Sequence, residues 1–107
     1  MKSMIQYKKT ERFTMLYSLY RKSNASSDYA TNMREIASNE GIGYRSFKAI
    51  FDYLCKENLM RMRSNSDQAD QFYYASITEA GIFAIEEVFR DENMETPYFP
   101  PYREMMM

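Results

Sequence analysis

The stretch GIGYRSFKAIFDYLCKENLM, residues 41–60, constrains the fold more than any other part of the chain. Its apolar residues recur at the spacing of one helix face: Phe47, Ile50, Phe51 and Leu54. Directly before them, Gly41 can take the left-handed conformation that ends a helix, and Gly43 can occupy the N-cap of the next. The stretch therefore predicts a tight turn plugged by Ile42, followed by an amphipathic helix over 44–57.

Two helices are expected before this turn. A helix over 10–22 is indicated by apolar residues at three- and four-residue spacing, with Thr10 as its N-cap: Phe13, Leu16, Tyr17 and Tyr20. The polar segment SNASSD, residues 23–28, reads as a loop. Asn32 lies three residues before Glu35, an arrangement close to a capping box, and predicts a short second helix over 33–40.

A β-hairpin and a last helix follow the amphipathic helix. Asn58 can adopt the positive φ that closes a helix, and LMRMR, residues 59–63, alternates apolar and basic residues like a half-buried strand. QFYYASIT, residues 71–78, is rich in aromatic and β-branched residues and supplies the returning strand. Thr78 is the expected N-cap of a helix whose apolar stripe is Ile82, Ile85, Val88 and Phe89.

The C-terminal segment METPYFPPYREMMM contains all three prolines of the chain, so it cannot continue the helix. Its aromatic residues favour docking, on its own domain or on a neighbouring molecule, over free disorder. The predicted organisation is an N-terminal extension over 1–9, one domain over 10–90 and a C-terminal tail over 91–107.

Composition argues against catalysis. The chain has no histidine, which removes the commonest general base and the usual nitrogen ligand of zinc. The lone Cys55 lies in an apolar helical pattern, where a thiol usually acts as a small buried hydrophobe rather than a redox group or nucleophile. We therefore expect no enzymatic activity, no cofactor and no metal. No apolar run is long enough for a membrane span and no secretory signal is evident, so a cytoplasmic protein is expected.

The charges are divided unevenly along the chain. Residues 1–66 carry 12 basic and 6 acidic residues, a net charge of +6, whereas residues 67–107 carry 2 and 9, a net charge of −7. Such asymmetry suggests a surface that faces a polyanion, coupled to a differently used C-terminal part. The alternative is two solvated faces of opposite sign.

The order helix, helix, turn, helix, hairpin, helix resembles the winged helix-turn-helix superfamily, especially small regulators of the MarR and PadR type. The matching text is REIASNEGIGYRSFKAIFDYLCKENLMRMR followed by YYASITEAG. Ile36 and Ala37 stand where these proteins carry a Leu-Ala pair, and ITEAG is similar to the LTEKG that opens the helix after their wing. The resemblance implies a mostly helical α+β fold with three helices, a two-stranded β-wing and a C-terminal helix that leads into the proline- and aromatic-rich tail.

The resemblance also implies a site. A recognition helix places the residues of its N-terminal half near base edges in the major groove, and basic residues around it contact phosphates. The expected base contacts are Tyr44, Arg45, Ser46, Lys48 and Ala49. The expected phosphate contacts are Lys48, Lys56, Arg61, Arg63 and Arg34. Asp52 on the same helix face, and Asp67 and Asp70 at the wing tip, run against this prediction, and a merely solvated helix face is the alternative.

Small regulators of this kind commonly dimerise through their first and last helices. The resemblance therefore implies a homodimer with interface candidates Tyr17, Tyr20, Phe89, Tyr98 and Phe99, for which simple core packing is the alternative. The expected function is sequence-specific binding of double-stranded DNA in transcription regulation, and the sequence identifies no small-molecule effector. A winged-helix module that binds protein and not DNA is the rival, because the second half is acidic and aromatic.

Overall fold

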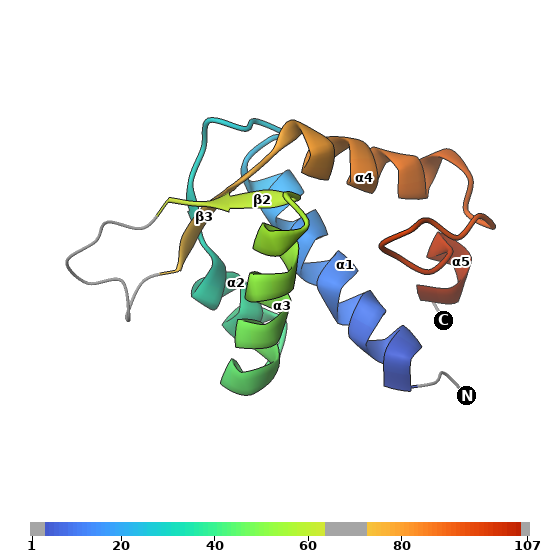
Figure 1. The fold of residues 1–107 in the computed structure, drawn as a ribbon, viewed down its shortest axis with the longest axis horizontal. Helices are drawn as coiled ribbons and strands as arrows, with labels where there is room; N and C mark the ends of the chain where they lie inside the picture. The colour runs from blue at the N-terminus through green and yellow to red at the C-terminus, as the bar shows by residue number, and fades with distance from the viewer. Residues whose placement is uncertain (1–3, 64–72, 106–107) are drawn as a thin grey trace.

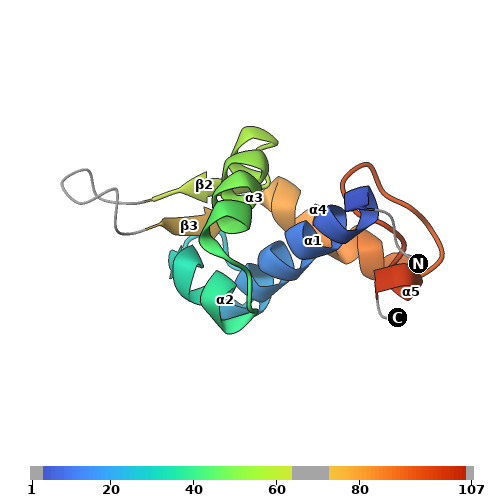
Figure 2. The same cartoon turned by 90° about the horizontal axis from the view of Figure 1, so that it is seen from below.

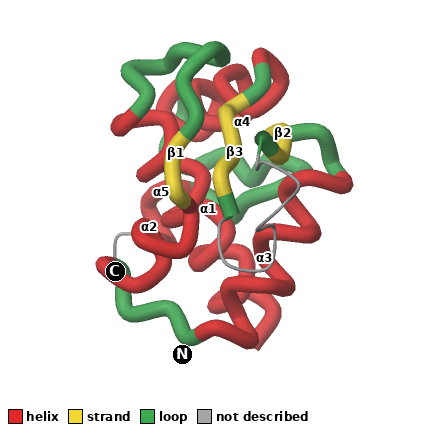
Figure 3. The backbone as a smooth tube through the Cα atoms, turned by 90° about the vertical axis from the view of Figure 1, so that its left-hand side faces the viewer, coloured by secondary structure: helices red, strands yellow, loops and turns green. Residues whose placement is uncertain are grey.

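A computed structural model describes residues 4–63 and 73–105 of the chain, which form a mostly helical α+β domain (Figure 1). Its elements in chain order are α1 (Met4–Lys22), β1 (Thr31–Asn32), α2 (Met33–Asn39), α3 (Tyr44–Lys56), β2 (Met60–Met62), β3 (Tyr74–Ile77), α4 (Glu79–Arg90) and α5 (Tyr102–Met105). The three strands form one antiparallel sheet in the order β1-β3-β2. In Figure 3 the strands stand side by side, with α3 below them and the loop after α1 above.

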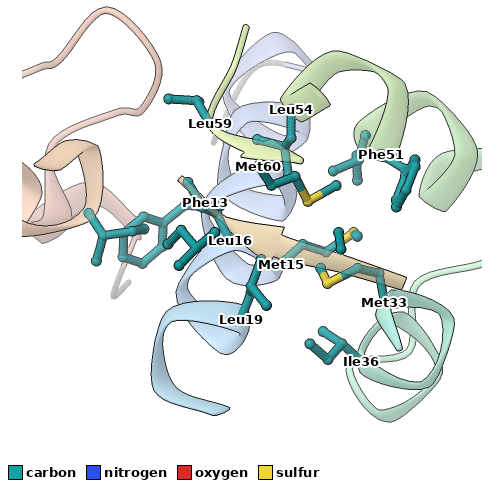
Figure 4. Packing of buried hydrophobic residues seen from close by; sticks show 14 of the residues in the cluster. Phe13, Met15, Leu16, Leu19, Met33, Ile36, Phe51, Leu54, Leu59 and Met60 are labelled. Carbon is teal, nitrogen blue, oxygen red and sulfur yellow. The ribbon is translucent and has the colours of Figure 1, made fainter. Parts of the chain in front are cut away.

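The core lies between α1, α2, α3, α4 and one face of the sheet. Met15, Leu16 and Leu19 of α1 are fully buried at its centre (Figure 4). The other elements contribute Met33, Ile36, Phe47, Phe51, Leu54, Leu59, Met60, Ile77, Ile85 and Val88. The predicted apolar face of α3 is confirmed, since Phe47, Ile50, Phe51 and Leu54 are all buried. Removal of this apolar surface from water is what holds the helices against the sheet.

The predicted turns and caps around α2 and α3 are confirmed. The Oδ1 atom of Asn32 accepts hydrogen bonds from the backbone amides of Arg34 and Glu35, which caps α2. Gly41 has a φ of 72°, and Gly43 occupies the N-cap of α3. Asn58 closes α3 with a φ of 60°. These positions set the direction in which α3 leaves α2 and enters β2.

Three expectations about the elements are wrong. The first helix begins at Met4, so it includes most of the expected N-terminal extension, and Thr10 lies within the helix rather than at its cap. The sheet has three strands where two were expected, because Thr31 and Asn32 pair with Ala75 and Tyr74. In α4 the buried stripe is Gly81, Ala84, Ile85 and Val88, so Phe89 lies outside it.

The tail docks on its own domain, one of the two alternatives that the sequence left open. Phe99 is 0% exposed and packs edge-on against Phe13 of α1, with ring centroids 5.5 Å apart. The hydroxyl of Thr96 accepts a 2.9 Å hydrogen bond from the backbone amide of Phe99, which holds the turn that inserts the ring. Beyond it, the backbone amide of Arg103 donates to the carbonyl of Glu92 at the end of α4. Phe99 is therefore wrong as an interface candidate, because its own core already covers it.

Within the described ranges, no helix combines the length and the apolar character needed to cross a membrane. The expected hairpin tip, with Asp67 and Asp70, lies outside the described residues.

Candidate nucleic-acid interface

The side of α3 that faces away from the core carries the residues expected to meet DNA bases. Because the apolar stripe is turned inward, the residues between its members point outward. All five are exposed, and we call them the α3 face: Tyr44, Arg45, Ser46, Lys48 and Ala49. Figure 2 shows α3 from below, with its first turns on the surface of the molecule. The docked tail lies beside α1 and α4, on the right in Figure 1.

One edge of the α3 face is organised around Tyr44. The guanidinium group of Arg34, from α2, lies over the Tyr44 ring at 4.8 Å from its centroid. The Tyr44 hydroxyl is 3.1 Å from the hydroxyl of Tyr73, whose ring is buried against Phe47 and Phe51. Tyr44 is 51% exposed despite these contacts. The structure thus brings Arg34 to the α3 face and holds it through an aromatic ring.

Lys48 is the residue of the α3 face with a charged partner. Its Nζ atom is 3.2 Å from Oδ1 of Asp52, one helical turn later. This hydrogen bond is the main reason that the pKa of Lys48 is raised, so the side chain stays charged at neutral pH. Both side chains are about half exposed, and such pairs stabilise proteins little. Asp52 therefore holds Lys48 only weakly.

The other edge of the α3 face borders a groove between α1 and α3. This open groove has a volume of about 260 Å³ and is lined from α3 by Arg45, Ser46, Ala49 and Ile50. From α1 it is lined by Lys8, Glu11 and Arg12. Lys8 and Arg12 thus join the basic surface, although no sequence pattern predicted their place there. Their position depends on how α1 crosses α3, and no local pattern encodes that crossing.

Arg12 is held in a fixed place beside α3. Its guanidinium carbon lies 3.9 Å from the centroid of the Tyr53 ring. Burial raises the pKa of the Tyr53 hydroxyl, and the charge of Arg12 opposes that shift in part. The Tyr53 hydroxyl is therefore neutral at physiological pH. Arg12 keeps its full positive charge while it stacks on the ring.

Arg61 and Arg63 are not brought together with the α3 face. In the register of the hairpin, Arg61 pairs with Ser76, whereas Met60 and Met62 pair with Ile77 and Ala75. Paired residues share a sheet face, and the face of Met60, Ala75 and Ile77 is the core face on which α3 packs. Arg61 and, by alternation, Arg63 lie on the opposite face, so they do not extend the α3 face. Lys56 is exposed in the last turn of α3, far along the helix from Tyr44.

No family model, curated protein or solved structure matches the chain.

Cys55 and the acidic residues are the side chains in the described part of the chain that could ligate a metal ion. No cluster of three or more histidine, cysteine or acidic residues there has the geometry to hold a metal ion. Cys55 is half-buried, and burial raises the pKa of its thiol, which leaves it protonated and weakly nucleophilic at neutral pH.

The remaining interface candidates gather where α1, α4 and the tail meet. Tyr17 stacks on Phe13 and packs at 5.2 Å against Phe89, which is 42% exposed. Tyr20 donates a 2.9 Å hydrogen bond to Glu86, and this bond raises the pKa of the Tyr20 hydroxyl. Tyr98 is half-buried in the tail.

The same end of the molecule is acidic. The second half of α4 and the chain after it carry Glu86, Glu87, Asp91, Glu92 and Glu95. In Figure 1 this segment lies to the right, above the start of α1 and away from α3. Much of the acidic charge of the second half of the sequence therefore lies away from α3.

Proposed function

We propose that the protein is a winged helix-turn-helix regulator that binds double-stranded DNA through the α3 face. The observation that carries the proposal is the exposure of Arg45 and Lys48 on the N-terminal half of α3, clear of the docked tail. A helix that buries one face and presents short polar and basic residues on the other fits the major groove. In this assignment α2 and α3 are the helix-turn-helix, and the antiparallel hairpin of β2 and β3 is the wing.

The residues of the α3 face take different roles in this proposal. Arg45 is the residue suited to bidentate hydrogen bonds with a guanine, and Ser46 and Tyr44 reach a base edge or a phosphate. Ala49 leaves room for the helix to approach the bases. Lys48 exchanges its partner Asp52 for a phosphate, and Arg34 meets the backbone from the side of α2.

The groove between α1 and α3 adds two phosphate contacts to those expected from the sequence. Lys8 and Arg12 flank Arg45 and Ser46, so a DNA strand that passes the start of α3 meets them next. Lys56 lies at the far end of the same helix. It contacts a DNA phosphate only if the DNA follows the whole length of α3. Phosphate contacts of this kind supply affinity and orientation, and the base contacts supply the choice of sequence.

A homodimer is part of the proposal, with Tyr17, Tyr20, Phe89 and Tyr98 at the interface. The rival function is a protein-binding module without DNA contact. Exposed apolar side chains in the acidic half favour it, since Phe83 is 55% and Met94 is 54% exposed. Under this rival the α3 face is an ordinary solvated surface.

Fluorescence anisotropy with labelled duplexes, first random and then selected from a random library, tests the proposal across a salt series. We expect the logarithm of the association constant to fall with the logarithm of salt concentration, with a slope of about −0.9 for each phosphate neutralised. For a selected site, Arg45→Gln should weaken binding by about 1–3 kcal/mol and relax the preference at one base pair. Lys8→Gln and Arg12→Gln should weaken binding to all sequences and each reduce the slope by about one unit.

The matched control is Arg61→Gln, which removes an arginine from the opposite sheet face and should leave the anisotropy titration unchanged. Absence of binding to any duplex at low salt would exclude the proposed function. Equal losses from Arg45→Gln and Arg61→Gln would mean that the basic residues act by general charge and that α3 is not the recognition element.

A further inference from the structure

A second groove lies on the sheet face opposite α3. It is open, has a volume of about 310 Å³, and is bounded by β2, β3, the start of α4 and the loop after α1. Its charged or polar lining residues include Arg61 of β2, Arg63 directly after β2, Ser76 of β3, Asp28 of the loop and Glu79 of α4. Figure 1 shows the loop after α1 above the two strands and α3 below them. The groove is therefore separate from the α3 face.

The floor of this groove contains an unsatisfied hydroxyl group. Ser76 is 1% exposed, and its Oγ atom has no hydrogen-bond partner. A buried hydroxyl without a partner destabilises the folded state, and a bound water or ion is one way in which such a group is satisfied. Thr78 also lines the groove, but its hydroxyl already has two hydrogen-bond partners. It donates to the carbonyl of Asn58 and accepts from the backbone amide of Gly81. The buried Thr31 hydroxyl is also unpartnered, but Thr31 pairs with Ala75 on the core face.

The charges around the groove are of both signs and are not paired with one another. Arg61, Arg63, Asp28 and Glu79 are all exposed. Among the residues that the structure describes, none of the four forms an ion pair within 4.0 Å of another. Two guanidinium groups beside a free hydroxyl suit a carboxylate, which accepts hydrogen bonds from all of them. Two carboxylates in the same lining repel a bare anion but attract an ammonium group.

We propose that this groove binds a small zwitterion of the α-amino-acid type. The ligand carboxylate faces Arg61, Arg63 and the Oγ atom of Ser76, and the ligand ammonium group faces Asp28 and Glu79. The volume is at the lower end of the range for small-molecule sites, and the lining is polar, which suits a small charged molecule better than an apolar one. The site is independent of the proposed DNA contacts, since it lies across the sheet from them.

Thermal unfolding of the full chain, followed by calorimetric titration, tests this proposal. The probes are the twenty amino acids added singly, with propionate, ethylamine and inorganic phosphate as molecules that carry one kind of charge. We expect at least one amino acid to raise the Tm by several degrees, because a ligand that binds only the folded state stabilises it. Propionate, ethylamine and phosphate should leave the Tm unchanged at the same concentration.

Two variants locate the site. Ser76→Ala removes the unsatisfied hydroxyl, so the variant should fold with a Tm equal to or above that of the parent, yet bind the amino acid at least about tenfold more weakly. Arg61→Gln should weaken binding similarly, whereas Arg45→Gln on the other side of the sheet should not. The proposal is overturned if no amino acid shifts the Tm, or if a singly charged probe binds as tightly as an amino acid. It is also overturned if Ser76→Ala binds the amino acid like the parent, because the Ser76 hydroxyl would then contact only an ordered water.

Discussion

Phe99→Ala is expected to lower the free energy of unfolding by about 3–5 kcal/mol, the usual cost of truncating a fully buried phenylalanine. The ring is 0% exposed, and it meets Phe13 at 5.5 Å and Tyr98 at 6.2 Å between centroids. Its loss leaves a cavity between α1 and the tail and removes the contact that keeps the tail in place. Urea denaturation followed by circular dichroism measures the change.

Phe83→Ala is the matched control for Phe99→Ala. Phe83 is 55% exposed on α4, and the guanidinium carbon of Arg90 lies 5.6 Å from the centroid of its ring. Removal of the same number of atoms should here cost less than about 1 kcal/mol. If both variants lose the same small amount, the tail is not packed into the core as described.

Gly81→Ala is expected to destabilise the protein by about 3 kcal/mol, at the upper end of the range for added atoms in a packed interior. Gly81 lies in the first turn of α4, where an added Cβ atom would overlap the carbonyl oxygen of Leu59 and come within 2.8 Å of Cγ1 of Ile77. Ile77 belongs to β3, and Leu59 directly precedes β2. Because the Leu59 carbonyl is backbone, α4 must move away from the start of β2. This steric cost exceeds the roughly 1 kcal/mol by which alanine favours a helix over glycine.

Gly43→Ala separates this overlap from a general effect of replacing glycine. An added Cβ atom at Gly43 has no neighbour within 4 Å, and the φ of −69° suits any residue. The expected loss is below about 1 kcal/mol and reflects the poor capping by alanine at the start of α3. A Gly81→Ala variant as stable as Gly43→Ala, measured by the same urea titration, would contradict the close approach of α4 to β2.

The elements that the sequence predicted well are those with local causes. The periodic apolar residues of α3, the Asn32 cap, and the turns at Gly41 and Asn58 each depend on side chains within a few residues, and all are confirmed. By contrast, β1 consists of Thr31 and Asn32 and exists only because it pairs with β3, more than forty residues later. A two-residue segment carries no alternation that could reveal it. The early start of α1 was missed because Thr10 has the character of an N-cap residue, whereas it lies within the helix.

The sequence predicted which residues of α3 are exposed, but not which residues of other segments lie beside them. The pattern in α3 correctly placed Tyr44, Arg45 and Lys48 on the exposed side, because a helix of known phase fixes which residues point outward. The pattern in β2 likewise indicated that Arg61 and Arg63 share a face, yet it could not reveal that this face is turned away from α3. The positions of Lys8 and Arg12, and the unpartnered Ser76 hydroxyl, depend on tertiary packing between distant segments.

The separation of acidic and basic residues has a consequence for how the molecule moves in an external field. With a net charge of only −1, the chain as a whole is barely repelled or attracted by a charged body. The basic α1–α3 side and the acidic end of α4 nevertheless make it an electric dipole. A nearby polyanion therefore exerts a torque before contact and turns α3 toward itself, so encounters begin with the molecule already aligned.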